Sequence, residues 1–165
     1  MFNEKVGMTD KMSSQVGKGF NSELLLKGNL RIELFGEDGS LKDVREIHNT
    51  TTSAGKYGLM EQILASPGLP KAGWMELGTG TPGATLLGSY ISGSRIAFTT
   101  ETRSNAVVTM VGNWAAGVGT GAITEAGVFD VVTQNTVNMW MSASFSVVNK
   151  GVNDTLQITW TLTAS

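Results

Sequence analysis

Two glutamates, Glu76 and Glu125, lie within apolar runs that we expect to be strands. Two carboxylates across an open cleft can cleave a glycosidic bond, one as the acid and the other as base or nucleophile. A buried carboxylate more often pairs with an arginine, here Arg95 or Arg103, or accepts hydrogen bonds from the backbone. We favour this structural role and keep the glycan-cleaving alternative open.

The chain has one histidine, His48, and no cysteine. A serine hydrolase needs a histidine base and a nucleophile on a sharp turn, but the sequence has no G-x-S-x-G motif. A metal site needs several ligands, and His48 has no His or Cys neighbour in the sequence. The sequence therefore predicts that the protein is not an enzyme and has no catalytic residue, cofactor or metal ion.

The stretch Gly78–Gly83 matches the dinucleotide-binding pattern G-x-G-x-x-G. That pattern works only where its glycines open a helix that holds a pyrophosphate, and Pro82 with the glycines that follow does not favour a helix. A second glycine cluster spans Gly117–Gly121, and no Lys-Ser/Thr pair follows either cluster, which excludes a P-loop. We expect both stretches to be loops, within the wider Gly- and Thr-rich segments 78–94 and 115–124 that can fit closely against a partner's backbone.

These residues must be positioned by strands, because the C-terminal third of the chain alternates apolar and polar residues. A period of two places alternate side chains on opposite faces of a strand. The alternation spans Val137–Val147 and Thr155–Thr163, and Asn149–Asp154 between them is rich in turn residues, so we expect an antiparallel hairpin. The side chains predicted to face the core are Met139, Met141, Phe145, Leu156, Ile158, Trp160 and Leu162.

Other short alternating runs bring the expected strands to about eight, the number in a jelly roll. One helix is expected at Ala54–Ala65, where Tyr57, Leu59–Met60 and Ile63–Leu64 form an apolar stripe and Ser53 could cap the start. We therefore predict an all-β, jelly-roll-like antiparallel sandwich over residues 30–165, with one short helix. The remaining expected strands are Leu30–Leu34, Leu41–His48, Trp74–Gly78, Arg95–Glu101, Asn105–Trp114 and Ile123–Val131.

Residues 1–29 have many glycines and scattered apolar residues, with no sustained period. Such a segment cannot offset its own ordering entropy, so we expect an extended arm that is held against another chain. Trp140 stands on the polar side of its strand, which indicates a covered patch and a partner or second sheet. The predicted partner-binding residues are Phe2, Val6, Met8, Met12, Val16, Phe20 and Trp140.

Composition narrows the partners. The 165-residue chain has a formal net charge of -2 and no basic run, which argues against nucleic acid as a partner. No apolar stretch approaches the roughly 18 residues of a membrane helix, and the N-terminus lacks the layout of a signal peptide. Only 16% of residues are charged, which fits a surface partly covered by other proteins.

Several stretches together resemble a family of small structural proteins from the particles of tailed bacteriophages. The stretches lie in order over about residues 28–163, and the N-terminal arm is not among them: Gly36–Gly39, Leu41–Arg45, Leu77–Thr81, Thr120–Phe129, Val147–Gly151 and Asp154–Leu162. The resemblance implies a non-enzymatic component of the capsid or of a tail or fibre assembly, and it carries over no catalytic residue.

From this resemblance and the composition we expect a capsid decoration, or cement, protein on the outer surface of the virion. Its expected partners are the major capsid protein and other copies of itself, as a dimer or trimer. A structural component of the tail, baseplate or fibre is the alternative. A glycan-cleaving tail protein that uses Glu76 or Glu125 is the enzymatic alternative.

Overall fold

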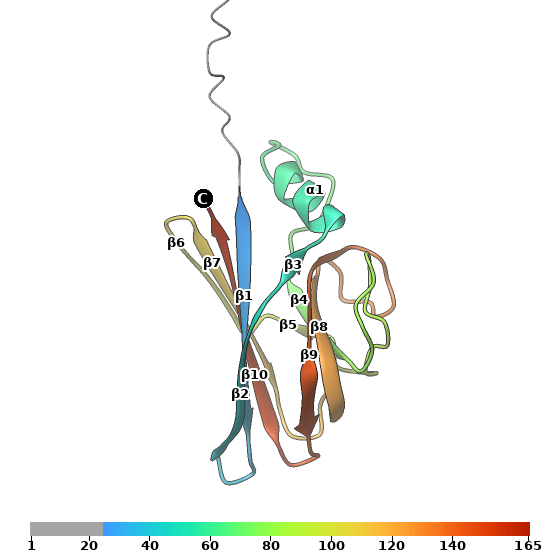
Figure 1. Ribbon diagram of the computed structural model, residues 1–165. Coiled ribbons are helices and arrows are strands. Elements are labelled where there is room, and N and C mark those ends of the chain that lie inside the picture. Colours follow the sequence, from blue (N-terminus) through green and yellow to red (C-terminus); the bar gives the residue numbers. More distant parts are fainter. Residues whose placement is uncertain (1–24) are drawn as a thin grey trace, which may run out of the picture.

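The computed structural model describes residues 25–165, which form two antiparallel five-stranded sheets packed face to face (Figure 1). Sheet A has the order β2 (Leu41–His48), β1 (Leu26–Phe35), β10 (Thr155–Ala164), β7 (Val107–Trp114) and β6 (Thr100–Ser104). Sheet B has the order β3 (Thr50–Thr51), β9 (Met139–Lys150), β8 (Gly121–Phe129), β4 (Trp74–Gly78) and β5 (Ile96–Ala97). The predicted all-β sandwich is confirmed.

The described strands number ten, rather than about eight. The run predicted as one strand at Arg95–Glu101 divides into β5 and β6, which belong to different sheets. Between them, Phe98 donates a backbone hydrogen bond to Gly73 and Thr99 donates one to Val111, so the chain crosses from sheet B to sheet A here. The chain crosses between the sheets without interrupting the alternation of apolar and polar residues. The sequence pattern therefore predicted a single strand.

Strand β1 begins before the predicted domain boundary at residue 30. Its first residue, Leu26, pairs with Ala164, and Asn29 pairs with Thr161 at the end of the chain. Residues 26–29 therefore belong to the sandwich and not to the arm. The six arm residues predicted to bind a partner lie outside the described residues.

The predicted C-terminal hairpin is wrong, because β9 and β10 belong to different sheets. Strand β10 pairs with β1 and β7, whereas β9 pairs with β8 and β3. The turn at residues 151–154 therefore connects the two layers of the sandwich. Alternation indicates which face of a strand is buried, but it does not indicate which strand is its neighbour.

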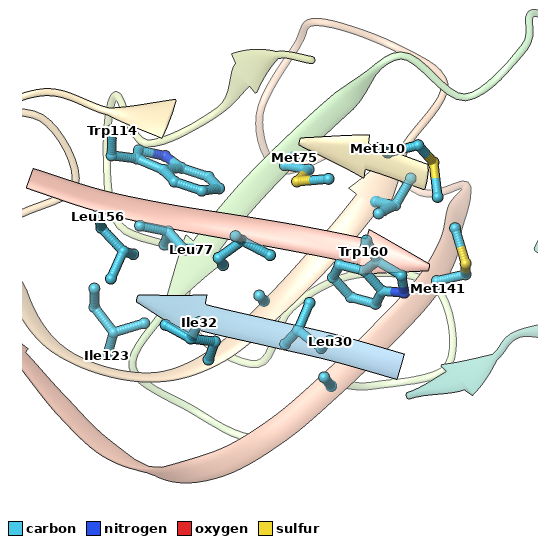
Figure 2. Close-up of a cluster of buried hydrophobic side chains, with 14 of the residues drawn as sticks. Leu30, Ile32, Met75, Leu77, Met110, Trp114, Ile123, Met141, Leu156 and Trp160 are labelled. Carbon is cyan, nitrogen blue, oxygen red and sulfur yellow. The ribbon is translucent and has the colours of Figure 1, made fainter. Parts of the chain in front are cut away.

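The main core lies between the sheets and is built from the inward faces of both (Figure 2). Leu156, Ile158 and Trp160 of β10 are at most 2% exposed, as predicted for that strand. Figure 2 shows Leu156 and Trp160 in one cluster with Trp114 and Met75 from other strands, and Ile158 belongs to the same cluster. Burial of such side chains contributes about 1.5–3 kcal/mol each, so this layer is a main source of stability.

Strand β9 departs twice from simple alternation. Val128 pairs with Met141 and the next residue, Phe129, pairs with Met139, so Trp140 between them has no partner in β8. Such a bulge shifts the residues on either side of it to opposite faces of the sheet. Met139 therefore packs with Phe129 outside the sandwich, while Met141 enters the main core, although the sequence predicted one face for both.

The second irregularity of β9 places Val148 inside instead of Val147. Ile123 pairs with Val148 and Glu125 with Ser144, which leaves three residues of β9 opposite one of β8. Val148 is 0% exposed and Val147 is 42% exposed, and Phe145 is only partly buried. The alternation thus changes phase within one strand.

Beyond the second bulge, Lys150 of β9 is buried as well. Its Nζ donates hydrogen bonds to the carbonyl oxygens of Ala115, at 3.0 Å, and of Asp154, at 2.7 Å. Burial lowers the pKa of Lys150, because the charged ammonium loses water. This end of the sandwich is therefore closed by a lysine that binds backbone oxygens on both sides.

Helix α1 (Ser53–Glu61) lies against β9 and is shorter than the predicted Ala54–Ala65. Thr52, rather than Ser53, caps its start, because the Thr52 hydroxyl accepts a hydrogen bond from the backbone N–H of Gly55. Glu61 is the last residue of the helix, and its carboxylate accepts a hydrogen bond from the N–H of Gly68. This bond holds the following loop against the last turn. The loop bends back where the sequence suggested another helical turn.

Candidate functional site

The Glu76 carboxylate is buried on the outer face of sheet B, under the loop before β5 and the loop after β8. One oxygen accepts a hydrogen bond from Arg95 at 2.7 Å, and these two side chains are only 2% and 1% exposed. The other oxygen accepts a hydrogen bond from the Gln134 amide. Glu76 thus holds together β4, the loop that contains Arg95 and the loop after β8.

The Arg95 guanidinium is held on several sides. It lies over the ring of Phe129, 3.7 Å from the ring centre. Its Nη1 atom donates to the carbonyl oxygens of Val131, at 3.1 Å, and of Thr133. A buried cation in contact with a carboxylate, an aromatic face and carbonyl oxygens is a structural clamp on this loop layer.

The Glu125 carboxylate binds backbone groups only. One oxygen accepts hydrogen bonds from the N–H groups of Gly80, at 2.9 Å, and Ser89, at 2.8 Å, and the other accepts one from Gly88 at 2.9 Å. A Cβ atom at Gly78 would lie 2.4 Å from this carboxylate, which explains the glycine there. The stretch Gly78–Gly83 leads out of β4 into this loop, as predicted, and its backbone amides bind a side chain of the protein itself.

The favoured structural role of both glutamates therefore agrees with their contacts. Glu76 pairs with Arg95, whereas Glu125 uses backbone donors, and Arg103 instead donates to the carbonyl oxygen of Asn105. A glycosidase needs two carboxylates that a sugar can approach from opposite sides. Here the two residues as a whole are 0–1% exposed, and each carboxylate is occupied by its own partners.

Asp130 is a further buried acid that the sequence analysis missed. It is 5% exposed, and neither carboxylate oxygen has a hydrogen-bond partner among the described residues. Its position directly after the apolar end of β8 was the one available signal. Across residues 25–165, no three His, Cys, Asp or Glu side chains gather closely enough to hold a metal ion.

His48 lies at the exposed outer face of sheet A. Its Nδ1 atom is 2.6 Å from the Oδ1 atom of Asn29, and both line a surface hollow of about 520 Å³. Arg31 in the same hollow binds Glu33 and Glu46 at 2.9 and 2.8 Å, and the bond to Glu33 is the main reason why the pKa of Arg31 is raised. The hollow holds an exposed ion network, and its polar groups bind one another.

Trp140 is covered by helix α1 of the same chain and is 5% exposed. A Cβ atom at Gly58 would lie 2.2 Å from its ring, and one at Gly55 would lie 2.1 Å from its carbonyl oxygen. The two glycines let the helix lie directly on the bulge, and Thr52 donates to the Trp140 carbonyl oxygen. Trp140 therefore contacts helix α1 of its own chain and not a partner, which corrects the prediction from the sequence.

Most of the predicted apolar stripe of α1 faces outward, because Gly55 and Gly58 occupy the inner face of the helix, whereas Leu59 packs against the main core. Tyr57 is 70% exposed and Met60 is 51% exposed, and directly after the helix Ile63 and Leu64 are 74% and 55% exposed. We call these four residues the α1 patch. Large exposed apolar patches commonly mark sites of protein contact. The stripe was predictable from the sequence, but the direction in which it faces was not.

No family model, curated protein or solved structure matches this chain. Within residues 25–165, no helix is long and apolar enough to cross a membrane.

Proposed function

We propose that this protein is a structural component of a tailed bacteriophage particle. The first candidate role is that of a capsid decoration (cement) protein. In this role it binds the major capsid protein at the outer capsid surface and contacts other copies of itself. A structural part of the tail, baseplate or fibre is the second candidate, and a glycan-cleaving tail protein is the third.

The observation that carries the proposal is the division of labour among the side chains. The buried carboxylates of Glu76 and Glu125 and the guanidinium of Arg95 bind loops of the same chain. The apolar residues of the α1 patch, in contrast, are directed to solvent. Groups suited to chemistry hold the fold, and groups suited to protein contact are free, which favours assembly over catalysis.

A cement role also suits the shape of the molecule. A sandwich whose loops are clamped by buried groups is a rigid body, and a rigid body loses little conformational entropy when it binds to a lattice. The many copies on a capsid all make the same contacts, so a modest contact area per copy stabilises the whole shell. A tail component would use the same rigidity with rotational symmetry about the tail axis.

The number of copies per particle tests the placement. Particles of the phage that encodes this chain would be purified, and the chain would be quantified by mass spectrometry against the major capsid protein. Cement predicts hundreds of copies, in a fixed ratio to the capsid protein. A few to tens of copies would favour the tail alternative, and absence from the particle would overturn both.

The glycan-cleaving alternative has its own test. Purified protein is incubated with host surface polysaccharide, and new reducing ends are measured for the wild type and for Glu76→Gln and Glu125→Gln. We expect no release from any of the three proteins. Release by the wild type that disappears in both variants would replace the structural proposal with an enzymatic one.

A further inference from the structure

The described chain begins beside the α1 patch. Leu25 and Leu26 line a surface hollow of about 440 Å³ together with Leu59 and Met60 of the helix. Leu25 is itself 51% exposed, so it extends the apolar surface of the patch toward β1. Figure 1 shows α1 and the start of β1 at the same end of the sandwich. The segment that precedes residue 25 is therefore attached at the edge of an exposed apolar surface.

Leu25 is itself fixed in line with strand β1. Its N–H donates to the carbonyl oxygen of Ser165 at 2.8 Å, and its own carbonyl oxygen accepts from Ser165 at 2.9 Å. These bonds continue the β1–β10 ladder by one more residue. The chain is thus held in line with β1 up to its first described residue, and it does not turn toward the helix of its own copy there.

The sequence of residues 1–24 is long and carries apolar groups. An extended segment of that length reaches at most about 80 Å, whereas a domain of this size has a radius of gyration of about 14 Å. The segment could therefore reach across to a neighbouring copy. Six of its apolar residues are those predicted to bind a partner: Phe2, Val6, Met8, Met12, Val16 and Phe20.

From these observations we infer that residues 1–24 of one copy dock on the α1 patch of a neighbouring copy. The particle proposal already includes contacts between copies; the inference adds which two surfaces of this chain meet, and it requires no capsid. The exposed patch needs an apolar partner surface, and residues 1–24 supply one. Because arm and patch belong to the same chain, they are present at the same concentration. The contact is head-to-tail, since arm and patch are different surfaces, so it builds closed rings or open arrays.

Two full-length variants test the inference by complementation. Met60→Glu with Ile63→Glu places charges in the patch and leaves the arm unchanged. Met8→Glu with Met12→Glu places charges in the arm and leaves the patch unchanged. The self-association of each variant and of the wild type is measured by sedimentation velocity over a range of concentrations, and circular dichroism and the unfolding temperature check that each variant is folded.

We expect the wild type to associate and each variant alone to be monomeric, with its association weakened at least tenfold. An equimolar mixture of the two variants should form a dimer, because one variant still offers an arm and the other still offers a patch. No larger species should form in that mixture, since its other arm and its other patch are both blocked.

Each other outcome overturns the inference. Association of the arm variant alone would mean that patches pair with each other. A wild type that stays monomeric at every concentration would mean that the patch takes its own arm or a different protein. The matched control is Val152→Glu, an exposed apolar residue, 63% exposed, in the turn between β9 and β10 at the opposite end of the sandwich (Figure 1). This variant should associate as the wild type does.

Discussion

The outer faces of the two sheets differ, although the two sheets share one core. On sheet A, buried and half-buried residues alternate along β10, and the threonines on the outer face are not covered by another layer. On sheet B, the last five residues of β8 are all buried, because the loops before β5 and after β8 lie over them (Figure 1). The covered face contains the pair Glu76–Arg95 and the carboxylate of Glu125.

This difference shows what a protein needs in order to cover a sheet with loops. Loops carry backbone N–H and C=O groups that lose water when they are buried, and each must find a partner. Glu125 supplies acceptors to three N–H groups, and Arg95 supplies donors to two carbonyl oxygens. An uncovered face such as that of sheet A needs no such anchors, and its charges can remain in water.

The largest effect is expected in the core that both sheets share. Trp160→Ala should lower the free energy of unfolding by about 3–5 kcal/mol, because it removes a large aromatic side chain from a packed interior. Trp160 is 0% exposed. Denaturant unfolding measures this loss, and the exposed control Tyr57→Ala should change stability by no more than about 0.5 kcal/mol. A loss below about 1 kcal/mol for Trp160→Ala would mean that the core is wrongly placed.

The next effect separates the two outer faces. Arg95→Met leaves the Glu76 carboxylate buried without its cation and should lower the free energy of unfolding by about 3–5 kcal/mol. Arg31→Met on sheet A breaks an exposed network and should have a much smaller effect, since water screens that pair.

The double variant Glu76→Leu with Arg95→Met removes both charges and should recover part of the loss caused by Arg95→Met alone. Chemical denaturation of the three variants under the same conditions gives the comparison. Equal losses from Arg95→Met and Arg31→Met would show that the loop layer does not bury its charges.

A smaller effect is expected where a charge binds only backbone. Glu125→Gln replaces one acceptor oxygen by an NH₂ group, which then faces a backbone N–H, and should lower the free energy of unfolding by about 1–3 kcal/mol. Hydrogen exchange of the amides of Gly80, Gly88 and Ser89 should speed up more than that of β10. Uniform acceleration across the sandwich would argue against a local anchor. Glu46→Gln on sheet A, whose carboxylate is 74% exposed, is the matched control.

The smallest effect is expected for the loss of stability in acid, through Asp154 in the turn that joins the two sheets. The hydrogen bond from Lys42, followed by one from the N–H of Gly151, lowers the pKa of Asp154. A lowered pKa in the folded state stabilises the protein above the ordinary value of about 3.9, and this stabilisation is lost as the pH falls through the lowered value.

Asp154→Asn should therefore lower stability at neutral pH and reduce the further loss on acidification. Unfolding temperatures measured between neutral pH and strong acid check this. Asp38 and Asp43 also have a lowered pKa, so part of the acid sensitivity should remain in the variant. An unchanged acid profile would show that the contact of Asp154 with Lys42 contributes nothing in solution.

Much of the fold could be predicted from sequence, since the strands at Leu41–His48 and Trp74–Gly78 have their predicted bounds. The candidate site was predictable in part: two glutamates within apolar runs indicated buried, partnered carboxylates. The partners of Glu125 were not predictable individually, because any backbone N–H can bind a carboxylate and sequence does not identify which loop lies nearby. Asp130 was missed because a single acid after a strand resembles an ordinary turn residue.

The sequence by itself determined where most strands and the one described helix lie and which face of β10 is buried, because these depend on residues within a few positions of one another. Only the tertiary structure decided that β9 and β10 lie in different sheets and that β9 changes phase at two bulges. It alone also placed Trp140 beneath α1 and directed most of the apolar stripe of α1, Leu59 excepted, to solvent. These outcomes depend on contacts between segments far apart in the chain, and a local period of two is the same for every arrangement of neighbours.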